Sequence, residues 1–146
     1  MTTAYRDFPI LVVEDSDEDF DTVLDALHNL GLACEIHRAI TGDACLNLLR
    51  GAALNPCMVL LDLNIPGTDG RVALREIKSD PVLRAIPVVV FSTSANPRDL
   101  AECYESGANA YHVKPLQYPD HIDILGRIFN YWLECATARQ TGNGPP

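Results

Sequence analysis

The sequence predicts an α/β fold in which a doubly wound parallel sheet of five strands has helices packed on both faces. Short apolar runs alternate with segments of helical period from one end of the chain to the other, an order typical of parallel sheets. The apolar runs, such as the three valines at positions 88–90, are continuous rather than alternating, which indicates strands buried on both faces. The length of 146 residues suits one compact domain.

The first half of the chain predicts two strands that alternate with two helices. The strands are apolar or partly alternating runs, and the helices carry apolar residues on one side. In chain order the four segments are residues 8–14, 17–30, 33–39 and 41–50. Thr41 is placed to cap the second helix, and Gly31 and Gly51 follow the two helices as expected stops.

The second half predicts three more strands, each followed by a helix. The strands are residues 57–62, 87–91 and 109–113, and the helices are a segment that carries Val72, Leu74 and Ile77, then residues 96–106 and 120–136. Pro97 falls in the first turn of its helix, where proline is tolerated. We expect one domain over residues 1–136 and a disordered tail over residues 137–146, which lack an apolar pattern.

Composition excludes several classes of function. The formal net charge of −9 would repel a phosphate backbone, so we expect no nucleic-acid partner. The N-terminus does not have the pattern of a secretory signal, and the longest apolar runs are too short to span a bilayer. We therefore expect a cytoplasmic protein with no membrane partner. Five widely spaced cysteines without a Cys-x-x-Cys pair argue against disulfides and a zinc site.

Polar residues end four of the five predicted strands. Because parallel sheets bind their ligands beyond the carboxyl ends of the strands, these side chains are expected to lie together. They are three acids, two hydroxyls and a lysine: Glu14, Asp15, Asp62, Ser92, Thr93 and Lys114. The strand over residues 33–39 contributes nothing comparable, which fits a peripheral position in the sheet.

The acids at this edge predict a cation site. Two carboxylates about 4 Å apart repel by roughly 4 kcal/mol at an effective dielectric near 20, and oxygen ligands without thiolate or imidazole suit Mg²⁺. Lys114 and Ser92 would suit a phosphoryl group carried on Asp62. Two simpler interpretations stay open, in which Asp62 is a turn or capping aspartate and Lys114 forms only a salt bridge to it.

The acidic run that follows the first strand divides between two roles. Glu14 and Asp15 end the strand and belong to the predicted cation site. Ser16 and Asp19 have the spacing of a capping pair. The acids of the first helical turn suit the positive end of the helix dipole: Asp17, Glu18 and Asp19.

Four short motifs in strand context resemble those of response-regulator receiver domains of the two-component, CheY-like type. They are LVVEDS at 11–16, LLDLNIPGTDG at 60–70, IPVVVFST at 86–93 and YHVKP at 111–115. The resemblance covers residues 8–136. It implies a flavodoxin-like and CheY-like (βα)5 fold with strand order 2-1-3-4-5, and a role as a single-domain regulator in a phosphorelay.

The resemblance also implies a role for each residue of the metal site. Asp62 would be the phosphoacceptor and would receive its phosphoryl group from a histidine kinase. Asp15 would bind Mg²⁺ directly together with Asp62, and Glu14 would bind it through water. Asn64 would offer its backbone carbonyl to the metal.

Further residues match the family's switch positions. Ser92 would be the switch hydroxyl, Lys114 would pair with the phosphoryl group, and Tyr111 would be the aromatic whose rotamer follows the switch. For Tyr111, an ordinary core or half-exposed aromatic is an equally open interpretation. The chain departs from the family in having Ser92 where threonine is usual and Thr93 where alanine or glycine is common. The larger Thr93 is expected to narrow access for water or a phosphodonor.

A narrower resemblance is to regulators that are paired with bacterial phytochromes. It rests on LDLNIPGTDG at 61–70, IKSDPVL at 77–83 and YWL at 131–133, although the sequence identifies neither the signal nor the downstream protein. The last helix is apolar over a broad arc, so surface would be left over for a twofold homodimer through this helix, the last strand and the helix before it. The interface candidates are Tyr111, Ile124, Ile128, Tyr131 and Trp132.

Two alternatives come from other classes of function. A metal-dependent phosphatase or phosphotransferase could use Asp62 as its nucleophile, but the short connections leave no room for a substrate-binding cap. A degenerate receiver could act as a binding module that needs no phosphorylation. The presence of Glu14, Asp15, Asp62 and Lys114 argues against the second alternative, and we expect a phosphoacceptor rather than an enzyme.

Overall fold

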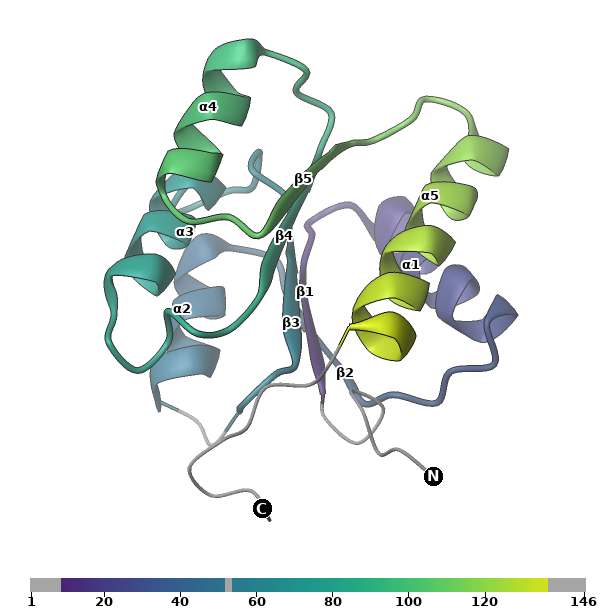
Figure 1. The fold of residues 1–146 in the computed structure, drawn as a ribbon, viewed down its shortest axis with the longest axis horizontal. Helices are drawn as coiled ribbons and strands as arrows, with labels where there is room; N and C mark the ends of the chain where they lie inside the picture. The colour runs from purple at the N-terminus through teal and green to yellow at the C-terminus, as the bar shows by residue number, and fades with distance from the viewer. Residues whose placement is uncertain (1–8, 52–53, 137–146) are drawn as a thin grey trace.

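The computed structural model describes residues 9–51 and 54–136, so the predicted tail over residues 137–146 lies outside the described part. Five parallel strands form one sheet in the order β2-β1-β3-β4-β5, as the resemblance implied (Figure 1). The strands are β1 (Ile10–Val13), β2 (Ile36–Ala39), β3 (Met58–Leu61), β4 (Val88–Ser92) and β5 (Ala110–Val113).

The helices cover both faces of this sheet. They are α1 (Asp17–Asn29), α2 (Gly42–Gly51), α3 (Gly70–Ser79), α4 (Pro97–Glu105) and α5 (Tyr118–Asn130), followed by a π-helical turn, η2 (Tyr131–Cys135). Helices α1 and α5 lie on one side of the sheet, and α2, α3 and α4 lie on the other (Figure 1). The predicted class and strand order are therefore confirmed.

The helices begin where the sequence places side-chain caps. The Ser16 hydroxyl accepts a hydrogen bond from the Asp19 amide at 3.2 Å, and the Thr41 hydroxyl accepts one from the Ala44 amide at 3.0 Å. These bonds satisfy amides that have no partner within the helix. Gly31 has a φ of 68° after α1, which confirms the predicted stop.

Three details of the helices differ from the predictions. Gly51 is the last residue of α2 rather than a stop beyond it. Helix α5 begins at Tyr118, because Pro119 is tolerated in a first turn, and it changes to η2 at Tyr131 instead of continuing as an α-helix. On α3, which carries the predicted Val72, Leu74 and Ile77, Val72 is 37% exposed and the other two are buried.

The central strands are buried on both faces. Successive side chains of a strand point to opposite sides, so Leu11 and Val13 pack in the layer under α2 and α3 while Ile10 and Val12 pack in the layer under α1 and α5. Burial of each such side chain stabilises the fold by about 1.5–3 kcal/mol. This rigid sheet fixes where the ends of β1, β3 and β5 lie.

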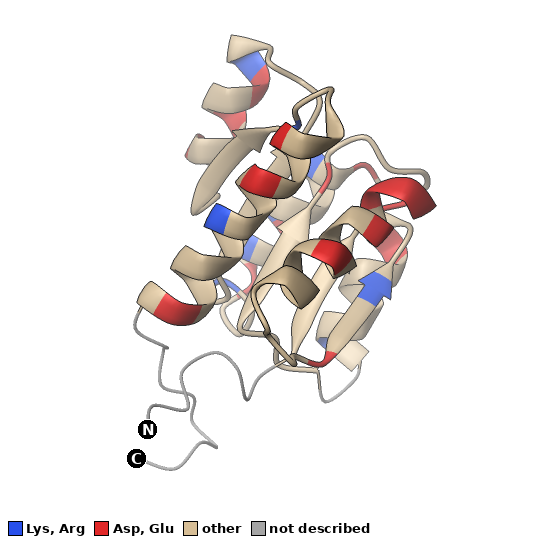
Figure 2. Cartoon of the chain, turned by 90° about the vertical axis from the view of Figure 1, so that its right-hand side faces the viewer, with Lys and Arg blue, Asp and Glu red and all other residues tan. Residues whose placement is uncertain are grey.

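The surface is rich in acids. The chain has 20 Asp and Glu against 11 Lys and Arg, and in Figure 2 the acidic positions are spread over several helices while the basic positions are scattered. Such a surface is unfavourable for nucleic acid. None of the described helices has the length and apolar character needed to cross a membrane.

Candidate metal and phosphoacceptor site

The parallel register brings three strand ends together. Val13 of β1 lies opposite Leu61 of β3, and the Asp62 amide donates to the Val13 carbonyl at 3.0 Å. At the other end of the sheet order, the Lys114 amide donates to the Ser92 carbonyl at 2.7 Å. The residues that follow β1, β3 and β5 therefore meet at one edge, as predicted.

The three predicted acids form one cluster. Glu14, Asp15 and Asp62 each offer a carboxylate oxygen, and these oxygens lie within 4.8 Å of one another. Glu14 and Asp62 are 5% and 8% exposed, whereas Asp15 is exposed. Hard oxygen donors with one open side fit Mg²⁺, which keeps several waters when a protein binds it.

Lys114 is the ammonium at the centre of this cluster and is 6% exposed. Its Nζ donates to Glu14 Oε1 at 2.5 Å, to Asp19 Oδ2 at 2.8 Å and to Asp62 Oδ2 at 3.0 Å. Burial alone would lower the pKa of Lys114, but the hydrogen bonds to Asp19 and Glu14 outweigh it and raise that pKa. The lysine is therefore firmly protonated, and its salt bridge to Asp62 is one of three.

The buried position of Glu14 disfavours the ionised form of its carboxyl group. Burial raises the pKa of its carboxyl group above the ordinary value, although Lys114 acts in the opposite direction. A divalent cation at the cluster would stabilise the ionised form of Glu14, because it adds the positive charge that burial makes necessary.

Asp19 is a site residue that the sequence interpretation missed. It was expected to act only in the cap and dipole of α1. Its backbone amide does donate to Ser16, but Glu14 Oε2, rather than Asp19, accepts from the Ser16 amide at 3.1 Å. The Asp19 carboxylate therefore reaches Lys114 instead.

The loop after β3 holds Asp62 from the other side. The Asn64 amide donates to Asp62 Oδ1 at 3.2 Å. A Cβ atom on Gly70, the first residue of α3, would lie only 2.4 Å from the Asp62 carbonyl oxygen. The close approach of α3 to the acceptor residue thus requires glycine at position 70.

The two predicted switch residues both contact Ser94, which the sequence interpretation did not identify. The hydroxyl of Ser92, which is fully buried, accepts from the Ser94 amide at 3.2 Å, and the Tyr111 hydroxyl donates to the Ser94 carbonyl at 2.8 Å. The Tyr111 amide also donates to the Tyr104 hydroxyl at 3.0 Å. Tyr111 is buried in this arrangement, while Thr93 is exposed beside the site.

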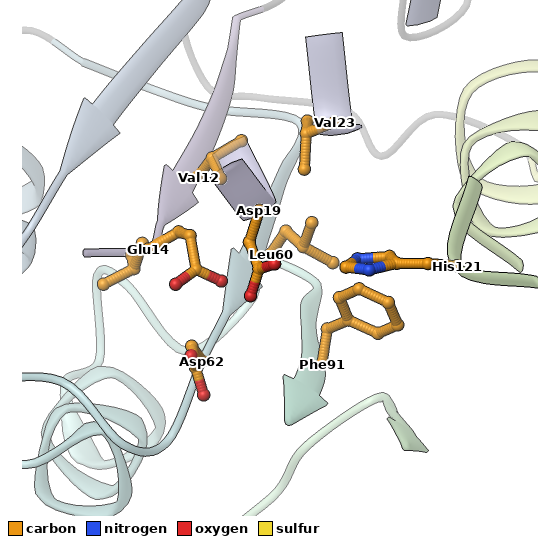
Figure 3. Close-up of a pocket in the computed structure, with 9 residues that line it drawn as sticks. Val12, Glu14, Asp19, Val23, Leu60, Asp62, Phe91 and His121 are labelled. Atoms are coloured by element: carbon orange, nitrogen blue, oxygen red, sulfur yellow. The ribbon is translucent and has the colours of Figure 1, made fainter. Parts of the chain in front are cut away.

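A small cavity of about 10 Å³, large enough for one water molecule, adjoins the cluster. Glu14, Asp19 and Asp62 line it together with Phe91 and His121 (Figure 3). His121 is 8% exposed, and its Nε2 has no hydrogen-bond partner among the residues that the structure describes. Burial lowers the pKa of this imidazole. A lone histidine in an amphipathic helix gave no sequence signal of this position.

The interface candidates differ in exposure. Ile128 is 3% exposed and Tyr111 is 9% exposed, so both lie in the chain's own core and offer little surface to a partner. The Tyr111 hydroxyl bonds to the Ser94 carbonyl in the β4–α4 loop, and Ile128 contributes to the wall of an open groove. Tyr131 is 54% exposed, and together with Ile124 and Trp132 it lines an open groove between β5, α5 and η2.

Comparison with known proteins places the chain in a family. The response regulator receiver domain family matches residues 10–125. The probable methanogenesis regulatory protein FilR2 of Methanothrix harundinacea is 40% identical over 130 residues, which cover 86% of this chain and 84% of that protein. Response regulator Rcp1 of Synechocystis sp. is 38% identical over 133 residues, which cover 88% of this chain and 90% of Rcp1.

Solved structures agree with these relatives. The phosphorylated cyanobacterial phytochrome response regulator RcpA is 37% identical and superposes with a TM-score of 0.88, over 92% of this chain and 99% of RcpA. The Mn²⁺-bound form of Rcp1 is 36% identical with a TM-score of 0.87, over 91% of this chain and 99% of Rcp1. The chain therefore belongs to the response regulator receiver domain family of two-component signalling and is homologous to the phytochrome response regulators.

Proposed function

We propose that this response regulator carries its signal as a phosphoryl group on Asp62, received from a histidine kinase in the presence of Mg²⁺. The observation that supports this most directly is the contact of the buried Asp62 carboxylate with Lys114 Nζ at 3.0 Å, within 4.8 Å of the oxygens of Glu14 and Asp15. Phosphoryl transfer requires mainly positioning and neutralisation of charge, and these groups can provide both.

In this mechanism an Asp62 carboxylate oxygen attacks phosphorus, and the bond from phosphorus to the donor's nitrogen breaks. Asp15, Asp62 and the Asn64 carbonyl would hold Mg²⁺ with Glu14 through water, and the bound ion would neutralise charge on the phosphoryl oxygens. Lys114 then exchanges its contact with Asp62 for one with a phosphoryl oxygen. The Ser92 hydroxyl would donate a hydrogen bond to a second phosphoryl oxygen. Thr93 would limit the access of water or a phosphodonor from the solvent side. The transfer leaves the receiver modified rather than turning over a substrate, so we propose that the chain is not an enzyme.

The proposed kinase partner is a phytochrome, and the proposed location is the cytoplasm. The support for this partner is the identity of 37–38% with RcpA and Rcp1, of which RcpA is described as a phytochrome response regulator. The receiver site does not distinguish one kinase from another, because it would contact only the phosphoryl group and the metal.

We also propose a homodimer through the α4-β5-α5 face. Its support is apolar surface on these elements: Tyr131 is 54% exposed, Val113 is 40% exposed and Tyr104 is 49% exposed. The groove that Ile124 and Trp132 line adds concave surface beside Tyr131. Such a face would bind a second copy or a downstream protein, and phosphorylation at Asp62 would change its affinity.

The test is phosphorylation of the full chain by acetyl phosphate with Mg²⁺, followed by intact mass measurement. We expect one added, base-labile phosphoryl group that Asp62→Asn abolishes, while the matched control Asp123→Asn, at an exposed acid of α5 outside the site, is modified like the native chain. Continued release of inorganic phosphate at many turnovers without a modified chain would instead indicate a phosphatase. An unmodified native chain would leave the alternative function, a binding module independent of phosphorylation.

A further inference from the structure

A charged pair links the beginnings of α3 and α4. Arg71 Nε and Nη2 donate to Asp99 Oδ1 and Oδ2 at 2.8 and 2.9 Å, and Arg71 Nη1 also donates to Asp69 at 3.1 Å. The Arg71 and Asp99 side chains are 26% and 15% exposed. A guanidinium and a carboxylate that meet through two parallel bonds fix each other's orientation as well as their distance.

The pair continues into the loop between β4 and α4. The Ser94 hydroxyl donates to Asp99 Oδ2 at 2.6 Å. Hydrogen bonds from Arg71 and then from Ser94 lower the pKa of Asp99 to about 2, so this carboxylate is ionised at neutral pH. Ser94 is therefore held by its side chain to an anion that Arg71 itself orients.

The backbone of Ser94 contacts both switch residues. Its amide donates to the Ser92 hydroxyl at 3.2 Å, and its carbonyl accepts from the Tyr111 hydroxyl at 2.8 Å. A serine hydroxyl can accept one bond and still donate its proton, so Ser92 remains able to donate to a phosphoryl oxygen. The position of the Ser94 carbonyl decides whether the buried Tyr111 hydroxyl has a partner, because an unpaired buried hydroxyl is unfavourable.

We propose that Arg71 and Asp99 are positioning residues for the switch: they hold Ser94 where its carbonyl accepts the Tyr111 hydroxyl, so that Tyr111 lies inward without a phosphoryl group. This inference deepens the proposed function, since it assigns the inward state of Tyr111 to a contact between α3 and α4. When Asp62 is phosphorylated, Ser92 would respond within a β4–α4 loop that Asp99 already holds through Ser94. The inward position of Tyr111 on the α4-β5 face would then exist before phosphorylation.

The experiment follows Tyr111 directly by NMR of the full chain labelled with ¹³Cζ-tyrosine, without any phosphodonor. Tyr111→Phe assigns the signal. In Arg71→Met and Asp99→Asn we expect the Tyr111 signal to move toward the value of an exposed tyrosine. The expected rise in the outward population is about tenfold or more, since bonds to charged groups have that strength. Arg71→Lys, which keeps the charge but loses the two-pronged geometry, is expected to give an intermediate shift.

The matched control is Arg75→Met, an exposed arginine one turn further along α3, which should leave the Tyr111 signal in place. The double variant Arg71→Met with Asp99→Asn should shift the signal no further than either single variant, because both remove the same pair. The inference is overturned if stability falls in the Arg71 and Asp99 variants while the Tyr111 signal stays at its native position. Because no phosphodonor is used, a failure of Asp62 to become phosphorylated would refute the proposed function without changing this result.

Discussion

At the scale of single residues, Lys114 is surrounded by more negative charge than it can balance. Its Nζ contacts carboxylates of Glu14, Asp19 and Asp62, and the exposed Asp15 lies beside them. Four acids and one buried lysine leave an excess of negative charge that favours a divalent cation. Mg²⁺ and Lys114 therefore stabilise the same carboxylates, and each should matter more when the other is absent.

The Lys114→Met variant tests this relation. We expect it to lower the free energy of unfolding by about 3–5 kcal/mol in EDTA, the usual effect of removing one partner from a buried ion pair. Part of the loss should be recovered in millimolar Mg²⁺, since the metal replaces the missing charge. Urea denaturation with and without Mg²⁺ measures both values, with Arg75→Met as a surface control that should change stability by less than about 0.5 kcal/mol. An equal loss in both conditions would contradict the expectation.

The burial of His121 leads us to expect that stability depends on pH. Burial lowers the pKa of the folded imidazole below 6.5, with a raising influence from Asp19 and a lowering one from Lys114. As pH falls through 6.5, the unfolded chain therefore binds a proton that the folded chain does not, and stability falls. His121→Phe should reduce this decline between pH 7 and pH 5, by at most about 1.4 kcal/mol per pH unit for one proton. Urea unfolding at several pH values measures how the free energy of unfolding changes with pH. His112, whose pKa burial also lowers, contributes to the same change. Parallel curves for variant and native chain would show that His121 has no such role.

At the scale of elements, the loop between β3 and α3 is held by close backbone contacts. A Cβ at Gly70 would meet the Asp62 carbonyl oxygen at 2.4 Å, and one at Gly42 would meet the Thr68 carbonyl oxygen at 2.0 Å. The side chain of Asp43 also accepts hydrogen bonds from the amide and hydroxyl of Thr68. Helices α2 and α3 therefore determine the path of the loop that carries Asn64 to the metal site.

The Gly70→Ala variant is expected to lower stability by about 1–3 kcal/mol, because the new methyl group overlaps backbone atoms that cannot move cheaply. It should also slow phosphorylation of Asp62 by acetyl phosphate, because the acceptor backbone must shift. The matched control is Gly126→Ala on α5, where a Cβ meets nothing within 4 Å. There the same substitution should raise stability by roughly 0.5–1 kcal/mol. Urea unfolding followed by circular dichroism measures both, and a tolerated Gly70→Ala would contradict the close-contact argument.

At the scale of the whole molecule, the charged site and the exposed apolar surface lie at different places around the sheet. Its carboxyl edge gathers the charged residues of the site, while the β5 side carries exposed apolar residues on α5 and η2. Asp99 of α4 contacts Arg71 of α3, and the loop before α4 contacts Tyr111 of β5. A change at Asp62 can thus reach the proposed interface through packed elements without a large rearrangement.

The proposed homodimer leads to a prediction at this scale. Tyr131→Glu and Trp132→Ala are expected to shift the chain from dimer to monomer, because they place charge or remove apolar area at the groove beside β5. Val82→Glu serves as the control, since Val82 is 83% exposed on the turn after α3, outside that face. Size-exclusion chromatography with light scattering measures the mass. A native chain that is monomeric with and without acetyl phosphate and Mg²⁺ would refute the dimer.

Most of the fold and the centre of the site could be predicted from the sequence. The order of apolar runs and helical segments sufficed for the parallel sheet, and the residues that end the runs sufficed for Glu14, Asp15, Asp62 and Lys114. The predictions were weaker for helix details, such as the start of α5 and the turn at Tyr131. These depend on how each helix is rotated against the sheet, which a short apolar pattern leaves partly open.

The sequence by itself determined which residues stand at the carboxyl edge of the sheet, because the end of a strand is a local property and parallel strands end on the same side. Only the tertiary structure decided that Asp19 binds Lys114, that His121 enters the cavity beside them, and that Arg71 and Asp99 hold Ser94. These contacts join residues from different elements. Their distances follow from helix rotation, loop path and side-chain rotamers, none of which is encoded in the spacing of residues along the chain.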